Sequence, residues 1–233
     1  MNEKYSTILF DADNTLLDFD MAEKNALTQI LGEIGVDVTD EITKLYSEIN
    51  LSYWRAFERG EVTKAELRTR RFKDLFEQIG FDYKNNLLFV ADTYLSYLAK
   101  GAFLLDGALY LCEKLKEAGY LLYIITNGVS ATQKSRLSKS GLDKVMDGVF
   151  ISEDIGVQKP FLKFFEYVFE NIREKDKSKI IVVGDSYGSD IKGACNAGLD
   201  CVWLNRKNEE NAHSLPITKE IESLSELFEF FDL

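Results

Sequence analysis

The 233 residues carry 28 Lys and Arg against 39 Asp and Glu, a formal net charge of −11, and 45% of the residues are hydrophobic. This length suits a core domain with a modest insertion, and the apolar content is enough to build a full core. The negative charge repels other polyanions, which disfavours nucleic-acid polymers as partners.

Several other classes of protein are disfavoured by what the chain contains. No apolar run is long enough to span a membrane, and the first residues do not form a secretory signal. The cysteines Cys112, Cys195 and Cys201 form no C-x-x-C pair, which favours reduced thiols in a cytoplasmic protein. The single histidine, His213, lies in a polar stretch, so we expect neither a Ser-His-Asp site nor a histidine-rich zinc site.

The first 100 residues change from one strand to a long helical region. The apolar run Ile8-Leu9-Phe10 predicts a strand. From residue 17 to residue 100 no strand is predicted, and Thr63-x-x-Glu66 has the pattern of a helix-opening capping box. Apolar residues at helical spacing predict four amphipathic helices in this region, at Leu27/Ile30/Leu31/Ile34, Ile42/Leu45/Tyr46/Ile49, Phe72/Leu75/Phe76/Ile79 and Ala91/Tyr94/Leu95/Leu98. We therefore expect residues 17–100 to form an inserted, all-helical cap domain.

The rest of the chain alternates between apolar runs and helical patterns. The runs do not alternate with polar residues, so both faces of each strand should be buried, as in a parallel sheet. They are Leu121 to Ile125, Val149 to Ile151, Ile180 to Val183 and Cys201 to Leu204. The predicted helices are Leu109 to Ala118, Ser130 to Ser140 with a capping box Ser130-x-x-Gln133, Phe161 to Ile172, Ser189 to Ala197, and one from Ser223. Residues 1–16 and 101–233 are thus predicted to form a doubly wound, Rossmann-like α/β core.

Polar residues follow these apolar runs at the points where strands should end. They are Asp11 and Asp13, Thr126, Lys159 before a predicted helix, and Asp185 with Asp190. The carboxyl ends of parallel strands share one edge of the sheet, where ligands bind. Taken alone, an Asp after a strand also fits a turn or a helix cap, and a Lys before a proline also fits a solvated surface position. Together, clustered carboxylates require a cation such as Mg²⁺, and a Lys and a Thr beside them suit phosphoryl transfer.

Four short motifs resemble those of the haloacid dehalogenase-like hydrolase superfamily. They are Asp11-Ala12-Asp13-Asn14-Thr15, Thr126-Asn127-Gly128, Lys159-Pro160 and Gly184-Asp185-Ser186-x-x-x-Asp190. The resemblance covers essentially the whole chain, and the helical insertion stands where the superfamily places its helical cap. Asn14 departs from the usual glycine, which should change the shape of the loop rather than the chemistry.

The resemblance implies a role for each matching residue. Asp11 would attack phosphorus and form an aspartyl-phosphate. Asp13 would protonate the leaving alcohol and then deprotonate the hydrolytic water. Since halide leaves without a proton, the presence of Asp13 favours phosphate chemistry over dehalogenation.

The resemblance also implies how the metal and the phosphate are held. Mg²⁺ would be bound by Asp11, the main-chain carbonyl of Asp13, and Asp185. Asp190 would orient metal-bound water from outside the ligand set. The phosphoryl oxygens would be bound by Thr126, Asn127 and Lys159.

A segment of the helical region bears on the substrate. Trp54-Arg55-x-Phe57-x-x-Gly60-Glu61-Val62-Thr63, followed by Arg71-Phe72, resembles the cap of YjjG-type pyrimidine 5′-nucleotidases, which hydrolyse nucleoside monophosphates such as UMP, dUMP and dTMP. Trp54 and Phe57 could stack on a base, and Arg71 could reach a carbonyl or a phosphate. The same side chains fit the core of a helical bundle equally well.

Two alternatives stay open from the sequence. The first is a related phosphatase or phosphomutase acting on a sugar phosphate or on a small phospho-acid such as phosphoglycolate. The second is a signalling receiver domain, which also gathers acids, a Thr and a Lys at strand ends. Receivers are shorter, carry the acceptor on a middle strand and lack a helical insertion. The sequence predicts a small phosphorylated ligand as the partner and leaves the oligomeric state open.

Overall fold

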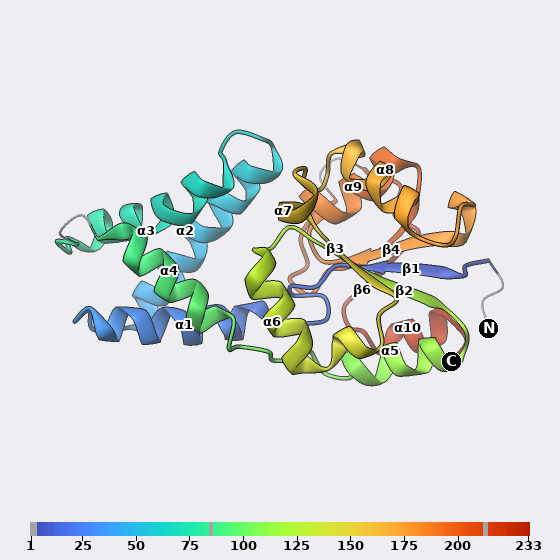
Figure 1. Cartoon of the computed structure of the whole chain (residues 1–233), viewed down its shortest axis with the longest axis horizontal. Coiled ribbons are helices and arrows are strands. Elements are labelled where there is room, and N and C mark those ends of the chain that lie inside the picture. The colour runs from blue at the N-terminus through green and yellow to red at the C-terminus, as the bar shows by residue number, and fades with distance from the viewer. Residues whose placement is uncertain (1–3, 84–85, 212–213) are drawn as a thin grey trace. The chain divides into compact units, whose positions relative to one another are not determined.

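The computed structural model describes residues 4–83, 86–211 and 214–233, so that His213 lies outside the described residues (Figure 1). The chain divides into two compact units. The core unit comprises Met1–Phe19 and Ala102–Leu233, and the helical unit comprises Asp20–Gly101. Within the described residues, no helix combines the length and the apolar character that a bilayer crossing requires.

The core unit is built on a parallel sheet that has six strands in the described part of the chain. The strands are β1 (Thr7–Phe10), β2 (Leu121–Thr126), β3 (Gly148–Ile151), β4 (Ile180–Gly184), β5 (Asp200–Leu204) and β6 (Lys219–Ile221), in the spatial order β3-β2-β1-β4-β5-β6. The chain winds outward from β1 to β3 and then returns to β4 on the other side of β1. This reversal places a topological switch point between β1 and β4, where doubly wound folds bind their ligands. The predicted fold class is confirmed.

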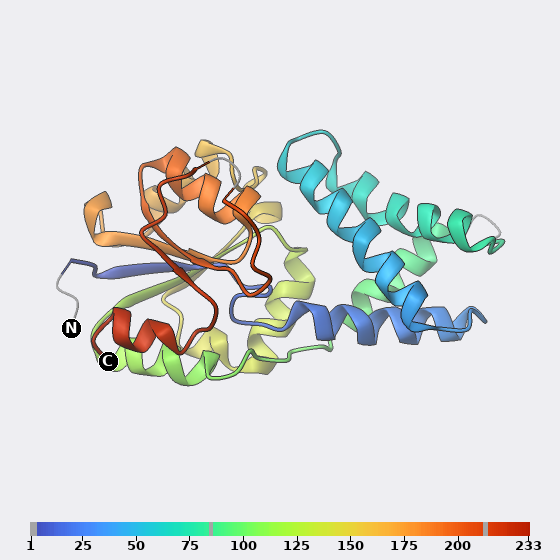
Figure 2. The ribbon, with the colours of Figure 1, turned by 180° about the vertical axis from the view of Figure 1, so that it is seen from behind.

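Both faces of the central strands are buried because helices cover each side of the sheet. Ile8 and Phe10 of β1 belong to one apolar cluster, and Leu9 between them belongs to the other. The first cluster includes side chains of α5 (Ala108–Glu117), α6 (Ser130–Ser140) and α10 (Glu226–Phe230), and the second includes those of α8 (Leu162–Asn171) and α9 (Lys192–Ala197). From behind, the green and red helices α5 and α10 lie together on one side of the sheet, and the orange α8 and α9 lie on the other (Figure 2).

Three sequence predictions about the core unit need correction. The short strand β6 was not predicted, because Ile221 is its only apolar residue. The prediction that both faces of every strand are buried is wrong for β3. Its Val149 is 36% exposed because β3 is an edge strand. The capping box at Ser130 is wrong: α6 begins after Val129 without a side-chain cap, and Gln133 reaches other partners.

The final helix also begins later than predicted. Ser223 was expected to start it, but α10 begins at Glu226. The Glu226 carboxylate still accepts a hydrogen bond from the Ser223 main-chain N–H at 3.1 Å. The two motif residues therefore meet across the start of the helix, with Ser223 in the turn that precedes it and Glu226 as its first residue.

The helical unit contains the four expected helices, α1 (Phe19–Glu33), α2 (Asp40–Glu58), α3 (Lys64–Ile79) and α4 (Leu87–Leu98). The predicted capping box at the start of α3 is present, with the Thr63 side chain accepting from Glu66 N–H and the Glu66 carboxylate accepting from Thr63 N–H. Aromatic rings fill the centre: the ring centroid of Tyr46 lies 5.2 Å from that of Phe72 and 5.7 Å from that of Tyr94. These stripes form the interior of the unit.

The two segments that join the units are paired where they leave the core unit. The Asp18 N–H donates to Phe103 O at 2.9 Å, and the Leu105 N–H donates to Leu16 O at 2.9 Å. Leu17 and Leu104 form an antiparallel bridge between these two bonds. The outgoing and returning chain are thus tied together within the core unit.

Candidate active site

The loop after β1 begins at the switch point of the sheet. The Asp11 main-chain N–H donates to Val183 O of β4 at 2.9 Å, so β4 fixes the position of Asp11. In the same loop, Asn14 has a φ of 56°. This angle lies in the left-handed region that glycine adopts readily and asparagine tolerates. The Asn14 side chain accepts from Phe19 N–H at 3.1 Å. Asn14 therefore supports the backbone shape that a glycine would give.

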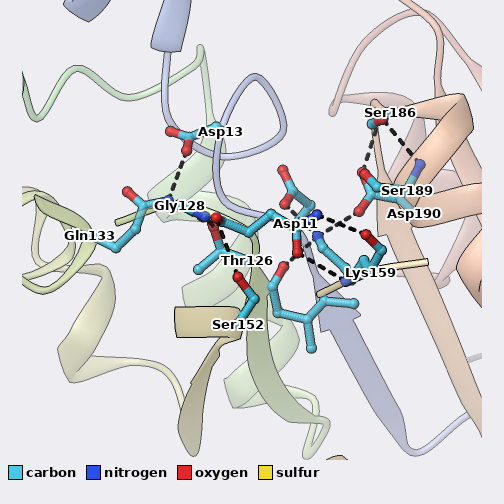
Figure 3. A network of polar contacts seen from close by, with 12 residues as sticks. Asp11, Asp13, Thr126, Gly128, Gln133, Ser152, Lys159, Ser186, Ser189 and Asp190 are labelled. Carbon is cyan, nitrogen blue, oxygen red and sulfur yellow. Dashed lines mark hydrogen bonds and ion pairs between the residues drawn. The ribbon is translucent and has the colours of Figure 1, made fainter. Parts of the chain in front are cut away.

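Lys159 connects three segments of the site (Figure 3). Its Nζ lies 2.7 Å from Asp11 Oδ1 and 2.6 Å from Asp190 Oδ1, and it donates to Ile125 O at 2.7 Å. The Lys159 side chain is 1% exposed. A buried ammonium is stable only when it is paired and hydrogen bonded. Lys159 therefore needs both carboxylates, and it holds them in place.

Asn127 positions Lys159 from the end of β2. Its side-chain Nδ2 donates to Lys159 O at 3.0 Å, and its Oδ1 accepts from Lys159 N–H at 2.9 Å. The Ser152 hydroxyl in turn donates to Asn127 O at 3.3 Å. The Asn127 amide thus supports the lysine segment, while the phosphate contact that the sequence predicts for this residue stays a prediction.

Burial has the largest effect on the pKa values of the carboxylates at this site, and neighbouring charges modify it. Burial raises the pKa of Asp11 to about 7 against the opposing effect of Lys159. Burial, with the charges of Asp11 and Asp190, also raises the pKa of Asp185 well above its ordinary value. Burial lowers the pKa of Lys159, but the neighbouring carboxylates outweigh this effect and raise the pKa above its ordinary value.

Three of the carboxylates meet in a group that suits a metal ion. Among the described residues, one oxygen each of Asp11, Asp185 and Asp190 lie within 4.8 Å of one another. Hard oxygen donors in excess of nearby cations fit a divalent ion such as Mg²⁺. Asp190 is already bound on both oxygens, to Lys159 through Oδ1 and to the Ser186 N–H through Oδ2 at 3.0 Å. This leaves Asp11 and Asp185 better suited to bind an ion directly.

Two neighbours shape the loop that carries Asp185 and Asp190. A Cβ atom on Gly184 would lie 2.4 Å from Asp190 Oδ2, so only glycine lets this carboxylate approach the end of β4. The indole N–H of Trp203 donates to Asp185 O at 2.9 Å and fixes the main chain beside the carboxylate. Gly184 has a packing role that an ordinary turn glycine lacks.

Thr126 and Asp13 are joined by a glutamine. The Gln133 Nε2 donates to Thr126 Oγ1 and to Asp13 Oδ2, both at 2.7 Å, and the Gly128 N–H donates to Thr126 Oγ1 at 3.1 Å. The Asp13 carboxylate also forms an ion pair with Arg136. Figure 3 shows Asp13 facing Gln133, whereas Asp11 faces Lys159. The Thr126 oxygen accepts these two bonds, so its own proton can be donated to a ligand.

The three residues predicted to select the substrate lie within the helical unit. Trp54 is half-buried and packs edge to face on Phe57, with ring centroids 5.8 Å apart. Arg71 is 3% exposed and donates to Asn50 Oδ1 at 2.8 Å, with its guanidinium 4.7 Å from the centre of the Tyr94 ring. Arg71 therefore stabilises the interior of the helical unit, and contact with a substrate stays a prediction for all three.

Sequence reasoning missed several residues that support the site. Gln133 was interpreted as part of a helix cap, and Arg136 and Trp203 were not singled out. Gln133 and Arg136 lie on the buried side of α6, where polar residues are unexpected. A polar pair at helical spacing on a face that packs against the sheet was the signal available in the sequence.

The fold and the site define a doubly wound α/β protein with a lysine and clustered carboxylates at its switch point. Residues 8–204 match the family model of the haloacid dehalogenase-like hydrolases. The pyrimidine 5′-nucleotidase PynA of Streptococcus pneumoniae is 40% identical over 98% of this chain and 95% of its own. The pyrimidine 5′-nucleotidase YjjG of Escherichia coli is 33% identical over 96% of both chains.

A solved structure shows the same likeness. The crystal structure of the HAD-hydrolase YfnB from Bacillus subtilis, bound to magnesium, superposes with a TM-score of 0.93 at 38% identity. The superposition covers 99% of this chain and 100% of YfnB. The chain therefore belongs to the haloacid dehalogenase-like hydrolase family.

We expect Gly184→Ala to lower both stability and turnover. The added methyl would displace the Asp190 carboxylate, and overpacking of this kind costs about 1–3 kcal/mol in the free energy of unfolding. Chemical denaturation would measure the loss. Gly32→Ala is the matched control, because a Cβ there meets nothing within 4 Å and alanine favours a helix. Equal effects of the two substitutions would contradict the packing role of Gly184.

We expect Mg²⁺ to raise the Tm more at about pH 8 than at about pH 5. From an ordinary carboxyl pKa of about 4 up to the value of about 7 for Asp11, the folded protein binds more protons than the unfolded one. Stability without metal therefore falls as the pH rises through this window. Thermal unfolding with Mg²⁺ or with EDTA measures the difference, and Asp185→Asn should reduce it. A Tm increase independent of pH and of Asp185 would contradict the metal site.

Proposed function

We propose that this protein is a Mg²⁺-dependent phosphate-monoester hydrolase of the cytoplasm that acts through an aspartyl-phosphate on Asp11, with pyrimidine nucleoside monophosphates as substrates. The observation that carries the proposal is the buried ion pair between Lys159 and Asp11 at the switch point, with Nζ and Oδ1 2.7 Å apart. It orients an otherwise weak nucleophile and places a positive charge beside the position of a phosphoryl group.

In the first step, the Asp11 oxygen not bound to Lys159, Oδ2, attacks phosphorus. The bond from phosphorus to the ester oxygen breaks, and Asp13, which enters this step protonated and leaves it ionised, passes its proton to the departing alcohol oxygen. The Thr126 hydroxyl donates a hydrogen bond to the phosphoryl oxygens, where charge develops. The Lys159 ammonium, whose three N–H groups bind Asp11, Asp190 and Ile125 O, stabilises the same charge through its positive charge. Both groups are held in place beforehand by Asp190, Gln133 and the strand ends.

In the second step, water attacks the phosphorus of the aspartyl-phosphate. Asp13, now ionised, accepts a proton from this water, and the Asp11 carboxylate is restored as inorganic phosphate leaves. A bound Mg²⁺ would be held by Asp11, Asp185 and the Asp13 carbonyl, and would neutralise charge on the phosphoryl group. Asp190, which ties Lys159 to the Ser186 main chain, keeps these groups aligned.

The substrate class rests on the relatives and on the helical unit. PynA and YjjG, both pyrimidine 5′-nucleotidases, match this chain over nearly its full length. In the helical unit, the half-buried Trp54 offers an aromatic face suited to a pyrimidine ring, and Phe57 supports it edge-on. Arg71, buried against Asn50, would act by fixing the helices that carry these rings.

We expect Asp11→Asn to lower turnover by at least about a thousandfold, because an amide cannot form the covalent intermediate. Release of inorganic phosphate measures the loss, and Asp143→Asn, at an exposed position of the core unit, is the matched control. Rapid acid quenching of the native enzyme, followed by peptide mass spectrometry, should find phosphate on Asp11. Phosphate on another residue, or an active Asp11→Asn protein, would refute the nucleophile.

We expect UMP, dUMP and dTMP to be hydrolysed with higher kcat/KM than sugar phosphates or phosphoglycolate. A panel of phosphate esters, assayed with Mg²⁺ and with EDTA, tests the substrate class and the metal requirement together. Faster hydrolysis of sugar phosphates would reject the nucleotidase and favour the related phosphatases. Stoichiometric phosphorylation without turnover would reject hydrolysis altogether.

A further inference from the structure

Helix α6 buries a polar face. Four of its residues are buried, and three of these, Thr132, Gln133 and Arg136, are polar, whereas Leu137 is apolar. A helix that covers a sheet ordinarily buries an apolar stripe. Residues three apart lie on the same face of a helix, so Gln133 and Arg136 present their side chains together. Core packing does not account for this pair.

The buried pair contacts two residues of the proposed mechanism. One amide group, Gln133 Nε2, lies 2.7 Å from Asp13 Oδ2 and 2.7 Å from Thr126 Oγ1. The Arg136 Nη1 binds the other carboxylate oxygen, Asp13 Oδ1, and lies 3.3 Å from Gln133 Oε1. Asp13 follows β1 and Thr126 ends β2. A single helix therefore fixes the spacing between groups from two different strands (Figure 3).

Burial makes the contact with Asp13 strong and directional. The Arg136 side chain is 0% exposed, and that of Asp13 is 27% exposed. A guanidinium away from water needs an anionic partner, and Asp13 supplies one while part of its carboxylate still faces outward. The Arg136 guanidinium also packs over the ring of Phe19, with its carbon 5.8 Å from the ring centre.

Gly128 leaves the room that Gln133 requires. A Cβ on Gly128 would lie 2.6 Å from three atoms of the Gln133 side chain. The Gly128 N–H meanwhile donates to the same Thr126 oxygen as Gln133 does. The loop after β2 is thus shaped around the glutamine.

We propose that Gln133 and Arg136 are positioning residues for the phosphate-ester reaction: Arg136 orients the Asp13 carboxylate toward the leaving oxygen, and Gln133 sets the distance between Asp13 and the Thr126 hydroxyl. This inference rests on the function proposed above. Neither residue touches the reacting atoms, so each acts through the group that it holds.

The test measures how the two residues affect the step in which the alcohol leaves. Alkyl phosphates need a proton from Asp13, whereas p-nitrophenyl phosphate has an acidic leaving group and needs little assistance. In single-turnover experiments, Arg136→Met should slow alcohol release from an alkyl phosphate by about ten- to a hundredfold. Release of p-nitrophenol should slow by less than about threefold. Arg136→Lys, which keeps the charge, should recover part of the loss.

Gln133→Leu should differ from Arg136→Met, because it removes the contact with Thr126 as well. We expect it to weaken inhibition by inorganic phosphate, the probe of the phosphate site, in addition to slowing alkyl esters. Arg136→Met should leave phosphate inhibition unchanged. The control on the same helix is Lys134→Met, which removes a cation from an exposed ion pair with Asp154 and should change neither quantity.

A double-mutant cycle separates positioning from a merely structural role. In an Asp13→Asn background, Arg136→Met should cause no further loss of alkyl-ester turnover. A full additional loss in that background, or an equal loss for alkyl and aryl esters, would overturn the inference. If Arg136→Met does not fold, as judged by circular dichroism, Arg136→Lys and Gln133→Leu decide by the same leaving-group comparison.

Different experimental outcomes would reject the proposed function and the positioning role of Arg136. A native enzyme that releases no phosphate from any ester, or an Asp11→Asn protein that stays fully active, would reject the function and the inference with it. A native enzyme that is active and depends on Asp11, with an Arg136→Met loss that ignores the leaving group, would reject only the positioning role.

Discussion

The buried ion pairs of Lys159 are the constraint on which the rest of the site depends. One ammonium, withdrawn from water, binds Asp11 after β1, Asp190 after β4 and a carbonyl of β2. Each partner is unfavourable to bury alone, so the segments stabilise one another only when all three strands are in register. The stability of the sheet and the geometry of the site are therefore energetically coupled. Because the carboxylates still outnumber the lysine, the site favours a divalent cation. Such a cation would attract an anionic substrate even though the protein as a whole is acidic.

The neighbours of this centre make it rigid. Asn127 binds both main-chain polar groups of Lys159, the Trp203 indole binds the main chain of Asp185, and Gly184 allows Asp190 to lie against the end of β4. Groups that are held before the substrate arrives need little reorganisation during the reaction. Fixed geometry of this kind suits phosphoryl transfer, which is catalysed mainly by positioning and by electrostatic stabilisation of the transition state.

Much of this could be predicted from the sequence, and the limits have physical causes. Continuous apolar runs identified the central strands, because strands buried on both faces have no polar positions. The same rule misses β6, which has one apolar residue, and overstates the burial of the edge strand β3. Motif residues at strand ends identified the carboxylates, and a motif before a predicted helix identified the lysine. Gln133 was misread because its spacing from Ser130 imitates a capping box, and the burial of Arg71 depends on tertiary contacts that local patterns do not contain.

The paired main chain at the exit from the core unit has a consequence for how such proteins diversify. Main-chain hydrogen bonds join the segment Leu16 to Asp18 to the segment Phe103 to Leu105. This pairing fixes both ends of the insertion without any contribution from the helices between them. The entropy of closing an insertion grows only slowly with its length. A recombination event could therefore exchange one bundle for another of different size without shifting the strands. Selection for new substrates could then act on the exchanged segment while the catalytic sheet was inherited intact.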